Sequence, residues 1–123
     1  MRIERELMRG AGPVSLLKLL ESGPKYGYEL VTSLAQQGEG ILDMGQSTLY
    51  PMLYNLEAQG FIKAAWEESE TGRNRKYYSL TPQVKKRLAN SVEQWRALAK
   101  AFHGLGILED GSPSRSALGG ATP

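Results

Sequence analysis

The chain has 123 residues, enough for one hydrophobic core, and its net charge at pH 7 is only +2. It has no cysteine and one histidine, His103, so a disulfide framework and a thiolate metal site are excluded, and we expect no metal and no cofactor. No apolar run approaches the roughly 20 residues that span a bilayer, and the charged N-terminus does not resemble a signal peptide. We therefore expect a cytoplasmic protein without a membrane partner.

The first third of the chain predicts two helices. Apolar residues recur near helical spacing over residues 4–22, but two glycines and a proline at 10–13 interrupt the pattern, so we expect a bend or break there. A second helix is expected at residues 26–37. Gly38 follows it directly and is predicted to be a left-handed C-cap.

A third helix is predicted to begin near residues 46–48, with Ser47 or Thr48 as its N-cap, and to end before Gly60. Its buried stripe follows the i, i+4, i+7 spacing and consists of Leu49, Leu53 and Leu56. The side chains off this stripe are Ser47, Thr48, Tyr50, Tyr54 and Asn55. This helix therefore has one face for the core and another that is available to a partner.

Two strands joined by a loop are predicted next, over residues 61–67 and 76–80. Of the adjacent Tyr77 and Tyr78, one is expected in the core, because neighbouring strand residues point to opposite faces. Cations gather at the tip of this hairpin at Arg73, Arg75 and Lys76. Three glutamates precede them, so any contact with DNA must come from a few placed cations rather than a broad basic surface.

A helix that can enter a major groove, followed by a hairpin with a basic tip, is typical of a winged helix-turn-helix. We therefore predict a mainly α fold with a small two-stranded antiparallel β-wing, in which residues 1–81 form the DNA-binding domain. The residues predicted to contact DNA are Lys25, Tyr28, Ser47, Thr48, Tyr50, Tyr54, Arg73, Arg75 and Lys76. Each has a purely structural alternative, such as a ring covering a helix flank, a helix cap or a solvated hairpin tip.

The last helix is predicted over residues 82–104, with Thr81 as N-cap and Pro82 as the first helical residue. Its apolar residues are Leu88, Val92, Trp95, Ala99 and Phe102. They are separated by 4, 3, 4 and 3 residues, which is the spacing of a heptad seam. Such a seam needs a partner, so we expect a C-terminal dimerisation helix that pairs with its copy in a homodimer. The Gly, Ser, Pro and Ala content that follows predicts a disordered tail at 105–123.

The sequence resembles the PadR family of bacterial transcriptional regulators over roughly residues 6–102. The resemblance rests on the segments Tyr26-Gly27-Tyr28-Glu29-Leu30, Thr48-Leu49-Tyr50-Pro51-Met52-Leu53, Leu56-Glu57 with Gly60-Phe61-Ile62, and Gly72-Arg73 with Arg75-Lys76-Tyr77-Tyr78 and Leu80-Thr81. It implies a regulator, in most members a repressor, whose partner is a double-stranded DNA operator. In the compact subclass the first and last helices form the dimer, which adds Leu7 and Val14 to the expected interface.

Trp95 has two alternative roles in this seam. It can simply pack the dimer. In multidrug-binding members of the PadR family, however, the matching tryptophan sandwiches planar ligands. By that alignment the walls of the slot around Trp95 are Gly10, Val14, Lys18, Ser91, Val92 and Ala99. A planar aromatic small molecule bound there could release the protein from DNA.

Two other classes of function are less consistent with the sequence than DNA binding. A winged helix can serve as a protein-interaction module without DNA readout, but such a module has less reason to keep a cationic wing and a polar outer helix face. An enzyme is not expected, since the sequence has no glycine-rich phosphate loop after a strand and no paired carboxylates with an obvious pocket. No catalytic residues are therefore assigned.

Overall fold

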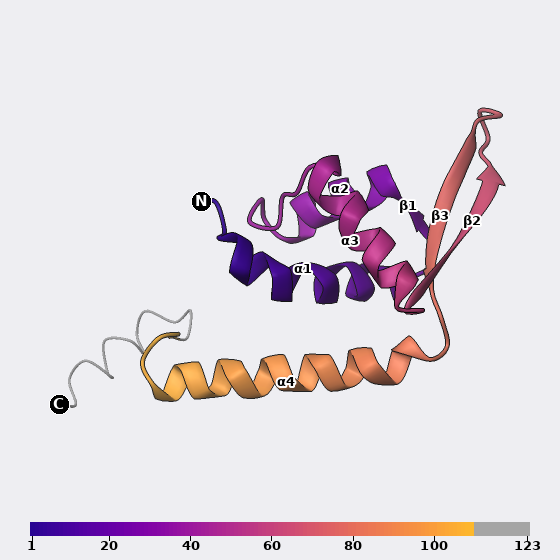
Figure 1. The fold of residues 1–123 in the computed structure, drawn as a ribbon. Helices are drawn as coiled ribbons and strands as arrows, with labels where there is room; N and C mark the ends of the chain where they lie inside the picture. The colour runs from indigo at the N-terminus through magenta and orange to yellow at the C-terminus, as the bar shows by residue number, and fades with distance from the viewer. Residues whose placement is uncertain (110–123) are drawn as a thin grey trace. The chain divides into compact units, whose positions relative to one another are not determined.

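The computed structural model describes residues 1–109, so most of the predicted tail, at 110–123, lies outside the described residues. The elements in chain order are α1 (Arg5–Leu20), β1 (Lys25–Tyr26), α2 (Gly27–Gln37), α3 (Gln46–Ala58), β2 (Ile62–Glu68), β3 (Asn74–Leu80) and α4 (Val84–Gly104), as Figure 1 shows. Together they confirm the predicted fold class, which is mainly α with a small β-wing. The chain divides into one compact unit, Met1–Ala89, and a second that begins at Asn90. Among the described residues, no helix has both the length and the hydrophobicity that a bilayer crossing requires.

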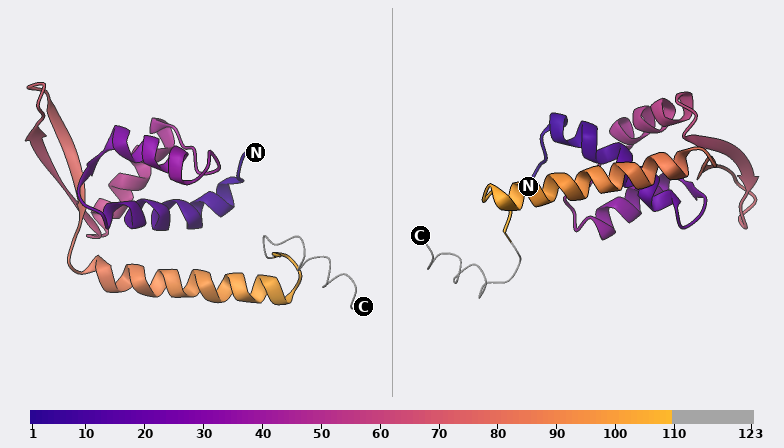
Figure 2. Two further views of the ribbon diagram at one scale, coloured as in Figure 1. Left: turned by 180° about the vertical axis from the view of Figure 1, so that it is seen from behind. Right: turned by 90° about the horizontal axis from the view of Figure 1, so that it is seen from below.

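The core of the first unit lies among α1, α2 and α3, and the β2–β3 hairpin projects away from these helices (Figure 2). The predicted leucine stripe of α3 is confirmed, because Leu49 and Leu53 are fully buried and Leu56 is 3% exposed. The first turns of α4 also belong to this core. Val84 is fully buried and Leu88 is 1% exposed. Leu88 was expected to need a second subunit, but residues of its own chain already bury it.

The sheet has three antiparallel strands in the order β1-β3-β2, one more than the predicted hairpin. The additional strand is β1, in which Lys25 pairs with Tyr78 and Tyr26 with Tyr77. Two residues are too few to show the alternating pattern by which a strand is recognised in a sequence. This pairing ties the start of α2 to the wing.

α1 is one continuous helix through Pro13, so the expected break at residues 10–13 is wrong. Proline lacks an amide donor, but packing on one face holds the helix together. Gly12 is buried there, and a Cβ atom on it would come within 2.8 Å of the Met52 sulfur. Ser15 adds a hydrogen bond from its hydroxyl to the Ala11 carbonyl, at 2.6 Å.

The left-handed residues after α2 are Glu39, with φ 53°, and Gly40, with φ 79°, whereas Gly38 has a φ of −87°. The amide of Glu39 donates to the Gln36 carbonyl and that of Gly40 to the Ala35 carbonyl, which is the Schellman pattern. Gly38 is needed for another reason. A Cβ atom there would lie 2.6 Å from the Leu34 carbonyl oxygen.

The N-caps of the last two helices also differ from prediction. α3 begins after Gly45, whereas Ser47 and Thr48 lie inside its first turn. α4 begins at Val84, because the Thr81 hydroxyl is engaged elsewhere, donating to the carbonyls of residues 60 and 61 at 2.8 and 3.1 Å. These bonds join the end of β3 to the connection between α3 and β2.

The residues that directly follow α4 are ordered, although the tail was predicted to begin at residue 105. Gly106 has a φ of 78°, and its amide donates to the His103 carbonyl. The amide of Ile107 donates to the carbonyl of Phe102 at 2.8 Å, which completes a Schellman cap.

Candidate nucleic-acid interface

The face of α3 opposite its leucine stripe carries polar and aromatic side chains. Ser47 and Thr48 are exposed in the first turn, and Tyr54 is 56% exposed two turns later. Tyr50 is only half-buried, and its ring lies 6.3 Å from that of Tyr54 at an interplanar angle of 36°. These side chains form the surface of the first unit best suited to enter a groove.

Tyr50 is anchored to α2 through Gly27. A Cβ atom on Gly27 would overlap the Tyr50 hydroxyl and would lie 2.8 Å from its Cζ atom. Glycine at this position therefore allows the two helices to approach each other. As a result the Tyr50 ring is positioned by α2, while more than half of the Tyr54 surface stays exposed.

On one face of the wing, a lysine lies between α3 and the sheet. Trp66 pairs with Lys76 and Ala64 with Tyr78, and directly paired residues share a face of the sheet. The Lys76 Nζ atom lies 5.7 Å from the Tyr54 ring centroid and 5.5 Å from that of Tyr78. Two aromatic rings thus hold this ammonium group beside the exposed face of α3.

The opposite face of the wing holds Arg75. Its guanidinium lies 4.4 Å from the centroid of the Tyr26 ring, and that ring meets Tyr77 edge-on at 5.6 Å. Glu67 is the cross-strand neighbour of Arg75, yet within residues 1–109 no ion pair joins them. Tyr26 is not among the site residues predicted from the sequence, because only the β1–β3 pairing brings it to Arg75.

The loop at the tip of the wing is closed by its own backbone. The Ser69 amide donates to the Arg73 carbonyl, and the Gly72 amide donates to the Ser69 carbonyl, both at 2.9 Å. Gly72 has a φ of 80°, a conformation that favours glycine. The Arg73 side chain is exposed and, within residues 1–109, has no ion pair, so this loop presents a free cation.

Tyr78 is the phenol most affected by its surroundings. Burial, together with the nearby Tyr54, Tyr50 and Glu57, raises the pKa of Tyr78 to about 12. The side chain therefore stays neutral under physiological conditions. It contributes to the core of the sheet, as predicted for one of the two adjacent tyrosines, and Tyr77 is half-buried on the other face.

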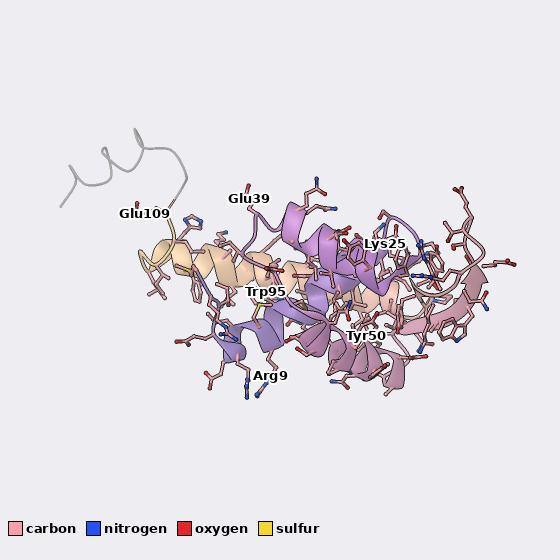
Figure 3. All side chains as sticks on the ribbon, turned by 90° about the horizontal axis from the view of Figure 1, so that it is seen from above. Arg9, Lys25, Glu39, Tyr50, Trp95 and Glu109 are labelled. Atoms are coloured by element: carbon pink, nitrogen blue, oxygen red, sulfur yellow. The ribbon has the colours of Figure 1, made fainter. Side chains whose placement is uncertain are left out.

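The two remaining residues predicted to meet DNA lie at the start of α2. Lys25 is half-buried on β1, and Figure 3 shows it near the base of the wing. Tyr28 lies in the first turn of α2 and is 61% exposed. β1 therefore places Lys25 next to the wing in the fold.

The residues predicted for the dimer and the ligand slot are divided between the two units. In the first unit, Leu7 is 60% exposed, Gly10 is exposed and Lys18 forms an ion pair with Glu21. In the second unit, Trp95 keeps 41% of its surface exposed. The slot joins residues of both units and stays a prediction.

The model of the transcriptional regulator PadR-like family matches residues 16–90, a range that contains α3 and the whole wing. Three solved structures are similar to this chain. A PadR family transcriptional regulator from Eggerthella lenta is 35% identical, with a TM-score of 0.71 over 85% of this chain and 88% of that one. A Streptococcus transcriptional regulator is 31% identical, with a TM-score of 0.74 over 84% and 99%. A transcriptional regulator from Clostridium thermocellum is 29% identical, with a TM-score of 0.72 over 80% and 96%.

Proposed function

Since the chain belongs to the transcriptional regulator PadR-like family, we propose that it is a repressor that acts as a homodimer on a pseudo-palindromic operator. The family is one of transcriptional regulators rather than enzymes, and DNA is the partner that such regulators bind. A cytoplasmic location is part of the proposal, because the operator would be found there.

The observation that supports this proposal is the exposed face of α3 with the wing cation Lys76 beside it. In this proposal α3 enters the major groove, and Ser47, Thr48 and Tyr54 reach base edges. Arg73 and Lys76 of the wing contact phosphates beside the helix, and these contacts position it without reading sequence. Lys25 and Tyr28 extend the backbone contacts, and Arg75 contributes the edge of its stacked guanidinium.

The operator proposal follows from symmetry. A homodimer related by a two-fold axis presents two copies of α3, so the sites that it prefers should be pseudo-palindromes. Their half-site centres should lie about 10 bp apart, or a multiple of that, since successive major grooves recur at that spacing. The dimer would form through Leu7 and Val14 of α1 and the seam residues of α4.

The test is to select bound duplexes from a random-sequence pool at physiological salt. We expect enrichment of a pseudo-palindrome, and we expect Ser47→Ala with Tyr54→Ala to relax the preference by about 1–3 kcal/mol for each lost base contact. The control is Lys63→Ala, which removes an exposed cation of β2 that is assigned no base contact. A parent protein that enriches no sequence would contradict the proposal.

Ligand release is the second part of the proposal. A planar aromatic compound stacked on Trp95 would weaken DNA binding if it favours a dimer geometry in which the two α3 helices no longer match successive grooves. The readout is quenching of tryptophan fluorescence in Trp66→Phe protein, because Trp66 is 69% exposed and would otherwise respond as well. If a chemically varied set of planar dyes produces no quenching, Trp95 has a packing role only.

A further inference from the structure

All four methionines of the chain line a single cavity in the first unit. The cavity has a volume of about 670 Å³, which is within the range of small-molecule sites. It is lined by the start of α1, the connection between α2 and α3, and the first turns of α3. Figure 1 shows how these segments follow one another in the fold. We name it the methionine cavity, after Met1, Met8, Met44 and Met52.

Methionine side chains are flexible and polarizable, so they adapt to apolar ligands of different shapes. Met44 is almost fully buried, Met8 and Met52 are half-buried, and Met1 is exposed. Ile3 and Ile41 add further apolar surface. These residues give the cavity an apolar wall that would receive a hydrocarbon or aromatic body.

The rim of the methionine cavity carries positive charge. Arg2, Arg5 and Arg9 line it, and none of them forms an ion pair with a residue in the described range 1–109. Arg5 and Arg9 are four residues apart on α1 and therefore lie on the same side of the helix. Figure 3 shows Arg9 extending outward from α1. The one carboxylate of the lining is Asp43, so cations outnumber anions there.

We infer that the methionine cavity binds an amphipathic monoanion, with its apolar body against the methionines and its carboxylate or sulfonate paired with Arg5 and Arg9. A DNA backbone would use the arginines but has no apolar body to fill the space between the methionines. A neutral apolar compound would fill that space but would leave the guanidinium groups unpaired. The combination of both features favours a small anionic ligand over either alternative.

Such a ligand would also contact α3, since Thr48 and Met52 belong to the lining. Met52 occupies the joint between α1 and α3, where a Cβ atom on Gly12 would come 2.7 Å from its Cε atom. A ligand that displaces the Met52 side chain would therefore change the position of α3 relative to α1. The effect on DNA rests on the proposed function, whereas binding itself does not.

The experiment is a titration of full-length protein, labelled with ¹³C at the methionine methyl groups, with naphthalene-2-carboxylate and with its neutral analogue naphthalene-2-carboxamide. Single Met→Leu exchanges assign the four methyl signals. We expect saturable shifts of Met8, Met44 and Met52 with the carboxylate and a response at least about tenfold weaker with the carboxamide, because charge-assisted hydrogen bonds are lost.

The matched variants separate the cavity from other sites. Arg5→Gln with Arg9→Gln should weaken carboxylate binding at least about tenfold, and both residues are exposed, so folding should be kept. Lys63→Gln with Lys86→Gln removes the same charge elsewhere on the first unit and should change nothing. Trp95→Ala should also leave the methyl shifts intact.

Several results would overturn the inference. Absence of methyl shifts, equal shifts with both compounds, or loss of the shifts in Trp95→Ala would each exclude an anion site in the methionine cavity. Methyl shifts on dilution of the protein alone would show that a second copy fills the cavity, and shifts produced by duplex DNA alone would assign it to DNA. The titration contains no DNA, so its failure is distinct from failure of the proposed function.

Discussion

At the scale of single residues, the phenol of Tyr78 in the core of the sheet should make the free energy of unfolding depend on pH. Its pKa is raised from 10.0 to about 12, with burial as the largest cause. Between these two values the folded protein keeps a proton that the unfolded chain has lost. The free energy of unfolding should therefore be fully retained below pH 10 and fall by roughly 2–3 kcal/mol as the pH rises from about 10 to about 12.

Tyr78→Phe should remove this alkaline loss and change the free energy of unfolding at neutral pH by less than about 1 kcal/mol, since the ring is kept. Urea unfolding at pH 8 and pH 11 measures the effect. Tyr28→Phe, which alters an exposed phenol, serves as the control and should keep the loss. An unchanged alkaline loss in Tyr78→Phe would show that other groups cause it.

The turn after α2 provides a second test at the residue scale. Glu39 adopts a left-handed conformation with φ 53°, which costs a residue with a side chain more than it costs glycine. Glu39→Gly should therefore raise the free energy of unfolding by about 1 kcal/mol. Gly38→Ala should lower it by about 1–3 kcal/mol, because the new Cβ atom would press on the Leu34 carbonyl oxygen. Thermal unfolding of the two variants compares them, and if both shift in the same direction, the assignment of the left-handed position is wrong.

At the scale of elements, the wing divides its cations by how they are held. Arg73 is free at the tip, whereas Arg75 is stacked on Tyr26 and Lys76 lies over Tyr54. β1 makes this possible, because its pairing with β3 places the Tyr26 ring under Arg75. A free cation and a stacked cation should respond differently to substitution.

Arg73→Ala should weaken binding to all duplexes by a similar factor and reduce the salt dependence by about one phosphate contact, with no change in stability. Arg75→Ala should do the same and also lower the melting temperature, because the Tyr26 ring loses its cation. Arg75→Lys should restore the charge but only part of the stacking. Fluorescence anisotropy over a salt series gives the slopes, with Lys63→Ala as control. Unchanged affinity at physiological salt in the Arg73→Ala, Arg75→Ala double variant would refute a DNA role for the wing.

At the scale of the whole molecule, the predicted homodimer depends on the part of α4 in the second unit. Leu88 is satisfied within one chain, so the seam that needs a partner begins at Val92. Trp95 and Leu98 keep 41% and 43% of their surface exposed, and Leu7 of the first unit keeps 60%. Exposed apolar side chains of this size on one helix, such as Trp95 and Leu98 on α4, are unusual for a monomer.

Sedimentation should show a dimer at micromolar concentration. Val92→Glu with Phe102→Glu should weaken the dimer at least about thirtyfold, as expected for loss of central apolar contacts worth roughly 2 kcal/mol. DNA binding should be lost together with the dimer. Lys100→Glu on the same helix lies off the seam and is the control. A parent protein that sediments as a stable monomer would rule the dimer out.

Local sequence patterns were sufficient to predict the helices, the basic hairpin and the leucine face of α3. Helical spacing of Leu49, Leu53 and Leu56 specifies which side of α3 is buried, and this specification requires no knowledge of the neighbours. The same patterns, with the short segments that resemble the PadR family, led to the predicted class of function. They also identified the exposed side chains of α3 and the cations of the wing as candidates for DNA contact.

The tertiary structure decided what depends on residues far apart in the chain. Pro13 is compatible with a continuous α1 because Gly12 packs on Met52. The Arg75 guanidinium stacks on Tyr26 because the β1–β3 pairing brings the two residues together. The Thr81 hydroxyl, predicted to cap α4, instead bonds to the carbonyls of residues 60 and 61. The methionine cavity likewise cannot be predicted from the sequence, because its four methionines come from three separate segments that come together only in the folded chain. Periodicity reports how one element faces the core, whereas caps, stacked cations and cavities depend on which elements meet, and that is a property of the folded chain alone.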